Sequence, residues 1–377
     1  MKLVKTAIVL MMMSGSVVAE NIRISGTISK TLKEPVVMPA GERNAHVALS
    51  TKTREIKLLN VVLSNKAKQV LANNAHHALA HSNQFDARAT VMHEELPSDV
   101  QLRMNQVPVL DQGNHGTCAT FAVTAAINAV LNKGAYVSEL CQLQVGNYLS
   151  KHGYTPSGWN GSLGRLVLSQ MDSLGIISKE QQATHGCGGF DQYPTQDADP
   201  ESSMNVEEYH QISEPLDQEK VTWWPILDVF QALTIRLDTN TILTDVKTAL
   251  ASGDRVMFGI LLLDFDLGTM GAVGTKTGTF TKSHYDTWVL TPEIARDILL
   301  RPEFGGHAML ITGYDDNAVA IDDKGREYKG LLTLRNSWGK KVGDQGDFYM
   351  SYDYFKLLVL EAQQIHNVDD DSDDDNI

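Results

Sequence analysis

The sequence predicts an α+β fold, because it contains both a long apolar helical run and separate apolar strands. The clearest helix is expected between Thr117, a good N-cap, and Gly134, a good stop, with apolar residues on every side. A helix that is apolar all round lies inside a domain. Two further apolar runs, 305–315 and 331–334, predict strands that end in turns. A buried helix and a sheet therefore share the core.

Weaker patterns add elements around this core. Helices are expected at 65–81 and 163–174, and a β-hairpin formed by 45–50 and 55–63. The polar and acidic stretch 190–225 predicts a linker or a long insertion, in which Trp223 and Trp224 are expected to pack between lobes. The glycine-rich stretch 267–278 is a candidate flap, but it lacks the residues of a phosphate loop.

Cys118 is expected in the first turn of the buried helix. Unpaired backbone N–H groups and the positive end of the helix dipole favour a thiolate there and can lower a cysteine pKa to about 3.5 to 7.5. Gln112 carries an amide that can donate to an oxyanion, and Gly113 and Gly116 allow a tight turn between the two. The plainer alternative is that Cys118 is a small buried hydrophobe, as most free cysteines are.

A nucleophilic thiolate needs an imidazole beside it, and the imidazole needs a third group that holds its tautomer. His307 lies near the start of the strand expected at 305–315, and Asn336 directly follows the strand expected at 331–334. Taken alone, such a histidine is more often a core residue, and Asn-Ser before Trp-Gly is often a turn. Together with Cys118, they supply nucleophile, base and orienting group.

Three motifs in this order resemble the papain and cathepsin family of cysteine peptidases. They are Gln-Gly-Asn-His-Gly-Thr-Cys at 112–118, Gly-His-Ala with Gly-Tyr within 306–314, and Asn-Ser-Trp-Gly at 336–339, followed by a Gly-x-x-Gly hairpin at 343–346. The resemblance implies a two-lobed fold, with a helical lobe, an antiparallel β-barrel-like lobe and the active site in the cleft between them. Residues 245–252 and 255–263 resemble the helix and the strand with which the family enters the barrel-like lobe. It also implies peptide-bond hydrolysis without a cofactor or a metal ion.

The roles implied by the resemblance carry over residue by residue. Cys118 would be the nucleophile, His307 the general acid and base, and Asn336 the group that orients the His307 ring. Gln112 would form the oxyanion hole with the backbone N–H of Cys118. Trp338, grouped here with the substrate-binding residues, would shield the hydrogen bond between Asn336 and His307 from water.

The family also binds extended peptides along a glycine edge, which Asn160, Gly161 and Ser162 resemble, with Ser162 in place of the second glycine. Two positions depart from the family pattern. His115 replaces a cysteine and is expected to be a solvated loop residue, and Ala119 replaces an aromatic residue. The separation of Cys118 from His307 also exceeds the usual spacing of about 130 to 150 residues, so insertions such as 264–304 are expected.

Three cysteines remain to be assigned in a chain that begins like an exported protein. If Cys118 is the catalytic thiol, Cys141 and Cys187 are left as a disulfide pair, at positions that resemble places where family members bridge the helical lobe. Residues 1–19 combine Lys2 and Lys5, an apolar run and small residues, which predicts a secretory signal peptide and a secreted, extracellular or periplasmic protein. A membrane anchor would need about 20 apolar residues.

The domain boundaries follow from these assignments. Residues 20–95 are expected to be an inhibitory pro-segment that docks near 160–162, or alternatively an independent binding domain. Residues 96–366 would be the peptidase domain, and 367–377 would be an acidic disordered tail. The expected partners are a peptide or protein substrate and the chain's own pro-segment, with the protein a monomer. A net charge of −14 and a pI near 5.3 argue against nucleic-acid binding.

Two alternatives remain open. Other Cys-His acyl-transfer enzymes, such as cell-wall amidases or transglutaminases, use the same nucleophile logic, but their usual motifs lack the Gln112 and Asn-Ser-Trp-Gly pattern. A catalytically inactive papain fold that serves in binding would be expected to lose one of the four catalytic positions, and all four are present.

Overall fold

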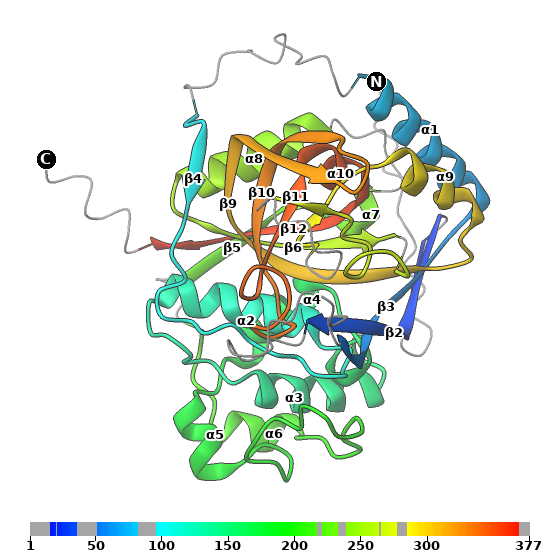
Figure 1. Cartoon of the computed structure of the whole chain (residues 1–377). Helices are drawn as coiled ribbons and strands as arrows, with labels where there is room; N and C mark the ends of the chain where they lie inside the picture. Colours follow the sequence, from blue (N-terminus) through cyan, green and yellow to red (C-terminus); the bar gives the residue numbers. More distant parts are fainter. Residues whose placement is uncertain are drawn as a thin grey trace, which may run out of the picture.

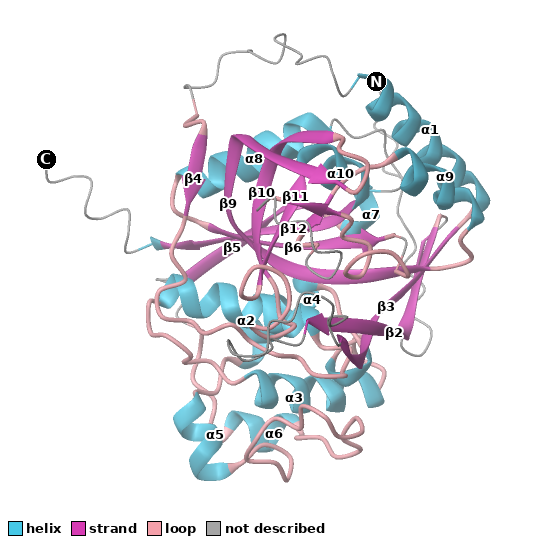
Figure 2. Ribbon diagram, viewed as in Figure 1, coloured by secondary structure: helices cyan, strands magenta, loops and turns pink. Residues whose placement is uncertain are grey.

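The computed structural model describes residues 16–19, 21–35, 51–81, 96–216, 221–232, 239–263, 265–276 and 285–368. The strand expected at 45–50, most of the expected signal peptide and the acidic run 369–375 lie outside these residues. Within them the fold is α+β and two-lobed, as predicted from the sequence, with a helical lobe next to a large sheet (Figure 1, Figure 2).

The helical lobe contains the central helix and the shorter helices that pack around it. Its elements are α2 (Cys118–Leu131), α3 (Glu139–Lys151), the 3-10 turn η1 (Gly158–Asn160), α4 (Gly164–Leu174), α5 (Lys179–His185) and α6 (Val206–His210). Four further helices lie beside the sheet: α7 (Val229–Ala232), α8 (Thr239–Ala251), α9 (Pro292–Leu300) and α10 (Tyr352–Leu358). Helix α1 (Asn65–His81) belongs to the N-terminal segment.

The strands form one sheet across the described residues. They are β1 (Ser16–Ala19), β2 (Ile22–Pro35), β3 (Thr51–Leu63), β4 (Asp99–Gln101), β5 (Val221–Leu227), β6 (Arg255–Leu262), β7 (Gly274–Thr275), β8 (Thr287–Trp288), β9 (Phe304–Asp322), β10 (Glu327–Arg335), β11 (Asp347–Ser351) and β12 (Val359–Asn367). The path β9-β10-β11-β8-β7 returns to β9, because β7 also pairs with β9. This closure makes the second lobe barrel-like.

Helix α2 lies where the two lobes meet, in contact with β9, β6 and β12 on one side and with α3 and α4 on the other. Every residue from 118 to 130 is buried, as its apolar composition predicts. Two details differ from the expectation. The Thr117 hydroxyl does not cap the helix and lies 3.0 Å from the Tyr193 hydroxyl, and the helix ends before Asn132, which adopts the left-handed conformation.

Several other predicted elements are confirmed, and α1, α4 and β6 match the expected bounds to within one residue. The other three are longer than expected: α8 begins six residues earlier, β10 begins four residues earlier, and β9 continues seven residues past the turn expected at 315. The second strand of the expected hairpin is present as β3, but it pairs with β2, which precedes the predicted stretch; the first expected strand, 45–50, lies outside the described residues. The 190–225 stretch is not a plain linker, since it contains α6 and part of β5.

The two aromatic and glycine-rich stretches also differ from expectation. Trp223 donates from Nε1 to Asp172 of α4 at 2.7 Å, but Trp224 is 40% exposed and does not pack between the lobes. The described part of the candidate flap is packed, because Met270 and Ala272 are buried and Trp288 donates to the Met270 carbonyl at 3.1 Å. The rest of that stretch, from 277 on, lies outside the described residues.

The N-terminal segment shares the sheet and core of the rest of the chain. Strand β3 pairs antiparallel with β9, with Leu59 opposite Gly306 and Val61 opposite Phe304. Helix α1 packs against α9 and α10, beside α9 in Figure 1. Residues from β2, β3 and α1 belong to the same apolar cluster as residues of β6 and β9. The segment is therefore joined to the peptidase domain by both pairing and packing.

Candidate active site

His307 and Asn336 come together at the ends of β9 and β10. The distance from Nε2 of His307 to Oδ1 of Asn336 is 2.8 Å, and the same Oδ1 accepts from the Ser337 backbone N–H at 2.7 Å. Because that oxygen is an acceptor, Nε2 of His307 carries the hydrogen and Nδ1 of the neutral ring keeps its lone pair. Within the described part of the chain, this Nδ1 has no hydrogen-bond partner. The ring is thus held in the tautomer of a base.

Trp338 covers this pair. Its ring stacks on that of His307, with centroids 4.6 Å apart and 22° between the planes, and it is 1% exposed. A hydrogen bond that water cannot reach is not exchanged for one with solvent. Trp338 thus lies in the expected shielding position. Because its side chain is buried, it does not face the solvent from which a substrate would approach.

Cys118 is the first residue of α2 and is 4% exposed. Burial raises the pKa of its thiol to about 11, although backbone N–H groups of Ala308 and Ala119 act in the opposite direction. The sulfur accepts from the backbone N–H of Ala308, the residue after His307, but it is not hydrogen-bonded to Nδ1 of His307. Burial also lowers the pKa of His307 to about 4, against the effect of Asn336. Both groups are therefore neutral in this form, and the expected lowering of the cysteine pKa is overridden by desolvation.

Gln112 is fully buried and fixed at both ends of its amide. Its Oε1 accepts from the Ser337 hydroxyl at 2.9 Å, and its Nε2 donates to the His115 carbonyl at 2.8 Å. The Ser337 carbonyl also accepts from the Gln112 backbone N–H at 2.8 Å. An amide nitrogen carries two hydrogens, so one remains for an oxyanion.

The expected substrate edge forms a tight loop after η1. Gly161 has a φ of 94°, which a side chain would strain, and Asn160 is exposed. The Ser162 hydroxyl donates to the Pro156 carbonyl at 3.0 Å and is turned into the loop. A Cβ on Gly161 would lie 2.5 Å from Cδ1 of Leu59, so a side chain of the N-terminal segment covers this edge.

The N-terminal segment reaches the site at further points. A Cβ on Gly116 would collide with the side chain of Thr27, and one on Gly306 would lie 3.1 Å from both Leu59 and Val61. The strand addition itself takes place at β9, through Leu59 and its neighbours, and not at residues 160–162 as the sequence suggested. The two glycines before His307 leave the space that β3 needs.

Two ion pairs add to this contact, and no local pattern in the sequence predicts either of them. Arg54, whose side chain is 9% exposed, donates to Asp111 at 2.7 Å and to the Trp338 carbonyl at 2.6 Å. Lys57 pairs with Asp199. The partners lie far apart in sequence, so only the folded chain brings them together.

His115 is not the solvated loop residue that the sequence predicted. Its side chain is completely buried, with Nδ1 2.6 Å from Asp199 Oδ1 and Nε2 on the Pro194 carbonyl. Its ring meets those of Trp159 and Tyr193 edge-on, at centroid distances of 5.0 and 5.5 Å. The prediction was wrong because the residues that bury His115 come from segments more than 40 positions downstream.

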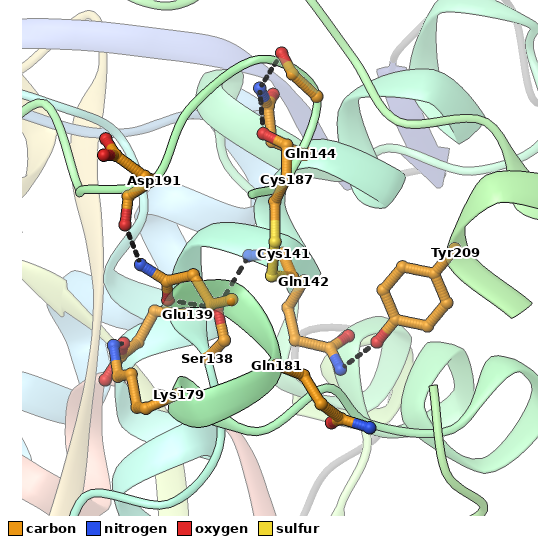
Figure 3. The surroundings of a disulfide bond; sticks show 12 residues. Ser138, Glu139, Cys141, Gln142, Gln144, Lys179, Gln181, Cys187, Asp191 and Tyr209 are labelled. Atoms are coloured by element: carbon orange, nitrogen blue, oxygen red, sulfur yellow. Dashed lines mark hydrogen bonds and ion pairs between the residues drawn. A yellow bond between two sulfur atoms is a disulfide. The ribbon is translucent and has the colours of Figure 1, made fainter. Parts of the chain in front are cut away.

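Cys141 and Cys187 form a disulfide, with Cα atoms 5.1 Å apart, that ties α3 to the segment after α5 (Figure 3). Closing a loop of 46 residues stabilises the fold by about 4 kcal/mol on the loop-entropy model. The amide of Gln144 donates to the Cys187 carbonyl at 3.3 Å, and Gln142 donates to the Tyr209 hydroxyl at 2.5 Å. Polar contacts therefore surround the bridge within the helical lobe.

No group of three or more His, Cys, Asp or Glu side chains in the described residues could hold a metal ion. In the same residues, no helix combines the length and the apolar character needed to cross a membrane.

The fold and the site together have the layout of a papain-like cysteine peptidase. The model of the Peptidase C1-like family matches residues 230–368, which contain His307 and Asn336. The resemblance that the three motifs predicted is thereby confirmed for this part of the chain. No curated protein matches the sequence.

Solved structures of cysteine proteases are among those similar to the chain. Xylellain, a cysteine protease from Xylella fastidiosa, has a TM-score of 0.43 and 19% identity, covering 73% of this chain and 90% of its own. The proform of the ragweed pollen allergen Amb a 11, a cysteine protease, has a TM-score of 0.42 and 17% identity, covering 78% and 72%. Procathepsin L 3 from the larval midgut of Tenebrio molitor has a TM-score of 0.42 and 17% identity, covering 78% of each chain.

Proposed function

We propose that the protein is a secreted cysteine endopeptidase that is made as an autoinhibited zymogen. It hydrolyses peptide bonds through an acyl-enzyme on Cys118, with His307, Asn336 and Gln112 as the other catalytic residues. The observation that carries this proposal is the state of the His307 ring, whose Nε2–H donates to Asn336 while Nδ1 keeps a lone pair. That lone pair is what a general base for the neighbouring thiol requires.

The reaction follows from these positions. The Cys118 sulfur attacks the substrate carbonyl carbon after its proton passes to Nδ1 of His307. The carbonyl oxygen becomes an oxyanion, which accepts from the free amide hydrogen of Gln112 and from the Cys118 backbone N–H. His307 then gives the proton to the leaving amine. A water molecule, deprotonated by the same nitrogen, attacks the thioester and releases the acid and the thiol.

The N-terminal segment supplies the inhibition. Strand β3 adds to β9 immediately before His307, and side chains of Thr27 and Leu59 lie against Gly116 and Gly161, where an extended substrate would lie. With the segment in place, Cys118 and His307 are buried and neutral. The segment thus occupies the space that a substrate needs, and the thiolate–imidazolium pair of Cys118 and His307 that attack requires is not formed.

Helix α1 anchors the same segment through contacts that lie outside the cleft. It packs on α9 within the insertion 264–304, and Lys68 donates to the Arg301 carbonyl at the end of α9. This packing supports an inhibitory pro-segment over an independent N-terminal domain, because both its strands and its helix share the core of the peptidase domain. Cleavage between 82 and 95 would cut the covalent link between the two parts of the chain and allow the segment to dissociate.

Secretion is proposed from the N-terminal pattern of residues 1–19 and supported by the disulfide, which forms and persists in oxidising compartments. N-terminal sequencing of the exported protein tests it, and a first residue of Glu20 is expected. An exported protein that retains Met1 would contradict the proposed signal peptide.

The peptidase activity is tested by titration with an epoxysuccinyl thiol inhibitor after the pro-segment has been cut and removed. One equivalent should label Cys118 and abolish turnover of a small peptide substrate. Cys118→Ala should be inactive, and Gln112→Ala should lose about a hundredfold to a thousandfold in kcat while remaining folded. An inactive binding protein would not be labelled at Cys118, and a related acyl-transfer enzyme would be labelled but would leave peptide bonds intact.

A further inference from the structure

Two cationic side chains of β3 meet carboxylates of the peptidase domain beside the candidate active site. Arg54 donates to Oδ1 of Asp111 at 2.7 Å, and Lys57 donates to Oδ2 of Asp199. The side chains of Arg54 and Lys57 are 9% and 25% exposed, so most of each lies against the domain. When the segment leaves, it takes both cations with it and uncovers both carboxylates.

Asp111 lies directly beside the catalytic groups. It precedes Gln112, whose amide is assigned to the oxyanion hole, and its backbone forms a bridge with that of Trp338. Arg54 donates to the carbonyl of the same Trp338 at 2.6 Å. The backbone N–H of Gly113 donates to Oδ1 of Asp111 at 2.9 Å, so the carboxylate is held by its own loop after Arg54 departs. A peptide whose carbonyl oxygen reaches Gln112 therefore passes close to Asp111.

Asp199 lies in the helical lobe, in the segment between α5 and α6. Its Oδ1 is 2.6 Å from Nδ1 of the buried His115, and its Oδ2 accepts from Lys57. The His115 carbonyl accepts from the Gln112 amide at 2.8 Å, so Asp199 is connected to the oxyanion hole through His115. Because His115 belongs to the peptidase domain, Asp199 also keeps its position when the segment leaves.

The two cations are three positions apart on one extended strand. At about 3.3 Å per residue their Cα atoms are about 10 Å apart, and an odd spacing points the two side chains to opposite faces of the strand. An extended peptide substrate offers the same geometry. Strand β3 covers the ground that such a peptide would cover, from Gly161 and Gly306 to Trp338. A substrate with two basic side chains would therefore reproduce both ion pairs.

The charges of the two parts of the chain favour the same class of ligand. Residues 20–95 contain 10 Lys and Arg against 7 Asp and Glu, whereas residues 96–377 contain 20 against 39. A strongly anionic domain attracts cationic peptides and speeds their encounter, and salt screens this attraction. Part of the excess lies in the acidic run 369–375, but Asp111 and Asp199 lie at the site itself.

We propose that the peptidase is selective for basic peptides, and that Asp111 and Asp199 each bind an Arg or Lys side chain of the substrate. Arg54 and Lys57 of the pro-segment imitate these two side chains in the zymogen. The two carboxylates determine specificity and take no part in the chemical step. This inference rests on the proposed peptidase function, so its test measures cleavage and binding separately.

Cleavage is measured with protein freed of its segment and with peptides that vary one position at a time around the cleaved bond. At two positions the wild type should prefer Arg or Lys to Gln by about tenfold in kcat/KM, as expected for partly exposed ion pairs in a cleft. Asp111→Asn should remove the preference at one position and Asp199→Asn at the other. Asp197→Asn, at an exposed site, is the matched control and should keep both preferences.

The ratio of the rates for basic and neutral peptides separates recognition from support of the fold. Asp199 also contacts His115, so its replacement can lower every rate by disturbing the loop. An equal loss for basic and neutral peptides in both variants would contradict the proposal. A wild type with no preference for a basic side chain at any position would overturn it.

Binding is measured in Cys118→Ala protein that has been cut with an added protease and separated from its segment. The probes are a fluorescent peptide with Arg and Lys three positions apart and its counterpart with Gln at both positions. The basic peptide should bind about a hundredfold more tightly at low salt, with a smaller difference at high salt. The double variant Asp111→Asn/Asp199→Asn should bind both peptides equally.

The two measurements also distinguish the failure of this inference from failure of the proposed function. Tight binding of the basic peptide without cleavage by the Cys118 protein would contradict the peptidase function and leave the recognition of basic peptides supported. Cleavage by the Cys118 protein, with equal binding of the basic and Gln peptides at low salt, would overturn this inference alone.

Discussion

The two parts of the N-terminal segment contact the peptidase domain by different means. The β2–β3 hairpin adds its backbone to β9 and uses charged side chains, with Arg54 on Asp111 and Lys57 on Asp199. Helix α1 buries apolar residues, with Ala72 and Ala75 at 1% and 0% exposure, against α9 and its neighbours. The hairpin therefore occupies the site through backbone pairing and ion pairs in addition to apolar packing, whereas the helix packs outside the site mainly through apolar residues.

The two parts therefore have different tasks: the hairpin blocks the active site, and α1 keeps the segment bound to the peptidase domain. Ion pairs that are partly open to solvent weaken with salt and with acid, whereas apolar burial does not depend on either in the same way. A cut between 82 and 95 removes neither kind of contact. We therefore expect a nicked protein to stay inhibited until the hairpin is displaced, with α1 delaying the departure of the segment.

The largest expected effect concerns the reactivity of Cys118 in the blocked and open states. In the intact chain a thiol pKa of about 11 leaves roughly one molecule in 10⁴ ionised at pH 7. Once the hairpin is gone, the helix N-terminus and an exposed His307 should favour the thiolate. Alkylation by iodoacetamide at pH 7 should be at least about a thousandfold faster after the segment is removed.

The control for this prediction is protein that has been nicked but not separated from its segment, which should react as slowly as intact protein. Mass spectrometry of the modified peptide identifies the alkylated residue. Equal rates for the intact and separated forms would show that the hairpin does not govern the thiol, and fast reaction of the merely nicked form would remove the retaining role of α1.

The next-largest effect is expected from the ion pairs that the hairpin makes with the peptidase domain. Arg54→Met removes a buried guanidinium that donates to Asp111 and to the Trp338 carbonyl. Because Asp111 is partly exposed and can be hydrated, the loss should be about 2 to 3 kcal/mol, or about a hundredfold in the affinity of the nicked segment. Lys52→Met, at an exposed position of the same strand, is the matched control.

Affinity for the nicked segment is measured from the rate at which peptidase activity recovers on dilution, at two salt concentrations. The wild type and Lys52→Met should lose affinity as salt rises, and Arg54→Met should show a smaller salt dependence. Identical affinities for Arg54→Met and the wild type would mean that the backbone pairing with β9 is sufficient for blocking.

Two adjacent residues of α1 test the apolar packing of that helix. Leu71 is 5% exposed and Val70 is 54% exposed on the same helix. Leu71→Ala should weaken retention by about 2 kcal/mol, or about thirtyfold, because it leaves a cavity between α1 and its neighbours. Val70→Ala should change it little. Recovery of activity by nicked Leu71→Ala should be faster with no altered salt dependence, and equal recovery of both variants would contradict a retaining role for the helix.

The sequence predicted the parts of the site that lie within continuous motifs. Helix α2, the histidine strand β9 and the strand before Asn336 were expected from local apolar patterns, and the structure brings His307 and Asn336 together in the motif order. The contacts of His115 and Arg54 were not predicted, because their partners are 84 and 57 residues away and leave no local pattern. The first strand of the hairpin was missed for a related reason, since alternation alone does not identify the partner of β3.

A buried carboxylate lies outside the N-terminal segment. Its titration gives the peptidase domain a pH-dependent stability that is independent of the hairpin contacts. Glu361 of β12 is 3% exposed and accepts from the backbone N–H groups of Gly164 and Arg165 at the start of α4, at 2.8 and 3.3 Å. Burial raises its pKa to about 7 despite these bonds. It therefore connects the two lobes and titrates near neutrality.

The sign of the effect follows from the raised pKa. In the unfolded chain Glu361 titrates near 4.5, so the folded state binds more protons between pH 4.5 and 7, and stability falls as pH rises through this window. Glu361→Gln keeps one acceptor for Gly164 and removes the buried charge. Above pH 7 it should unfold with a free energy about 1 to 2 kcal/mol higher than the wild type, the lost Arg165 bond offsetting part of the gain. Urea unfolding of protein freed of its segment, with Cys118 blocked, measures this at pH 5 and pH 8. A stability difference between variant and wild type that is the same at both pH values would show that Glu361 is not the titrating group.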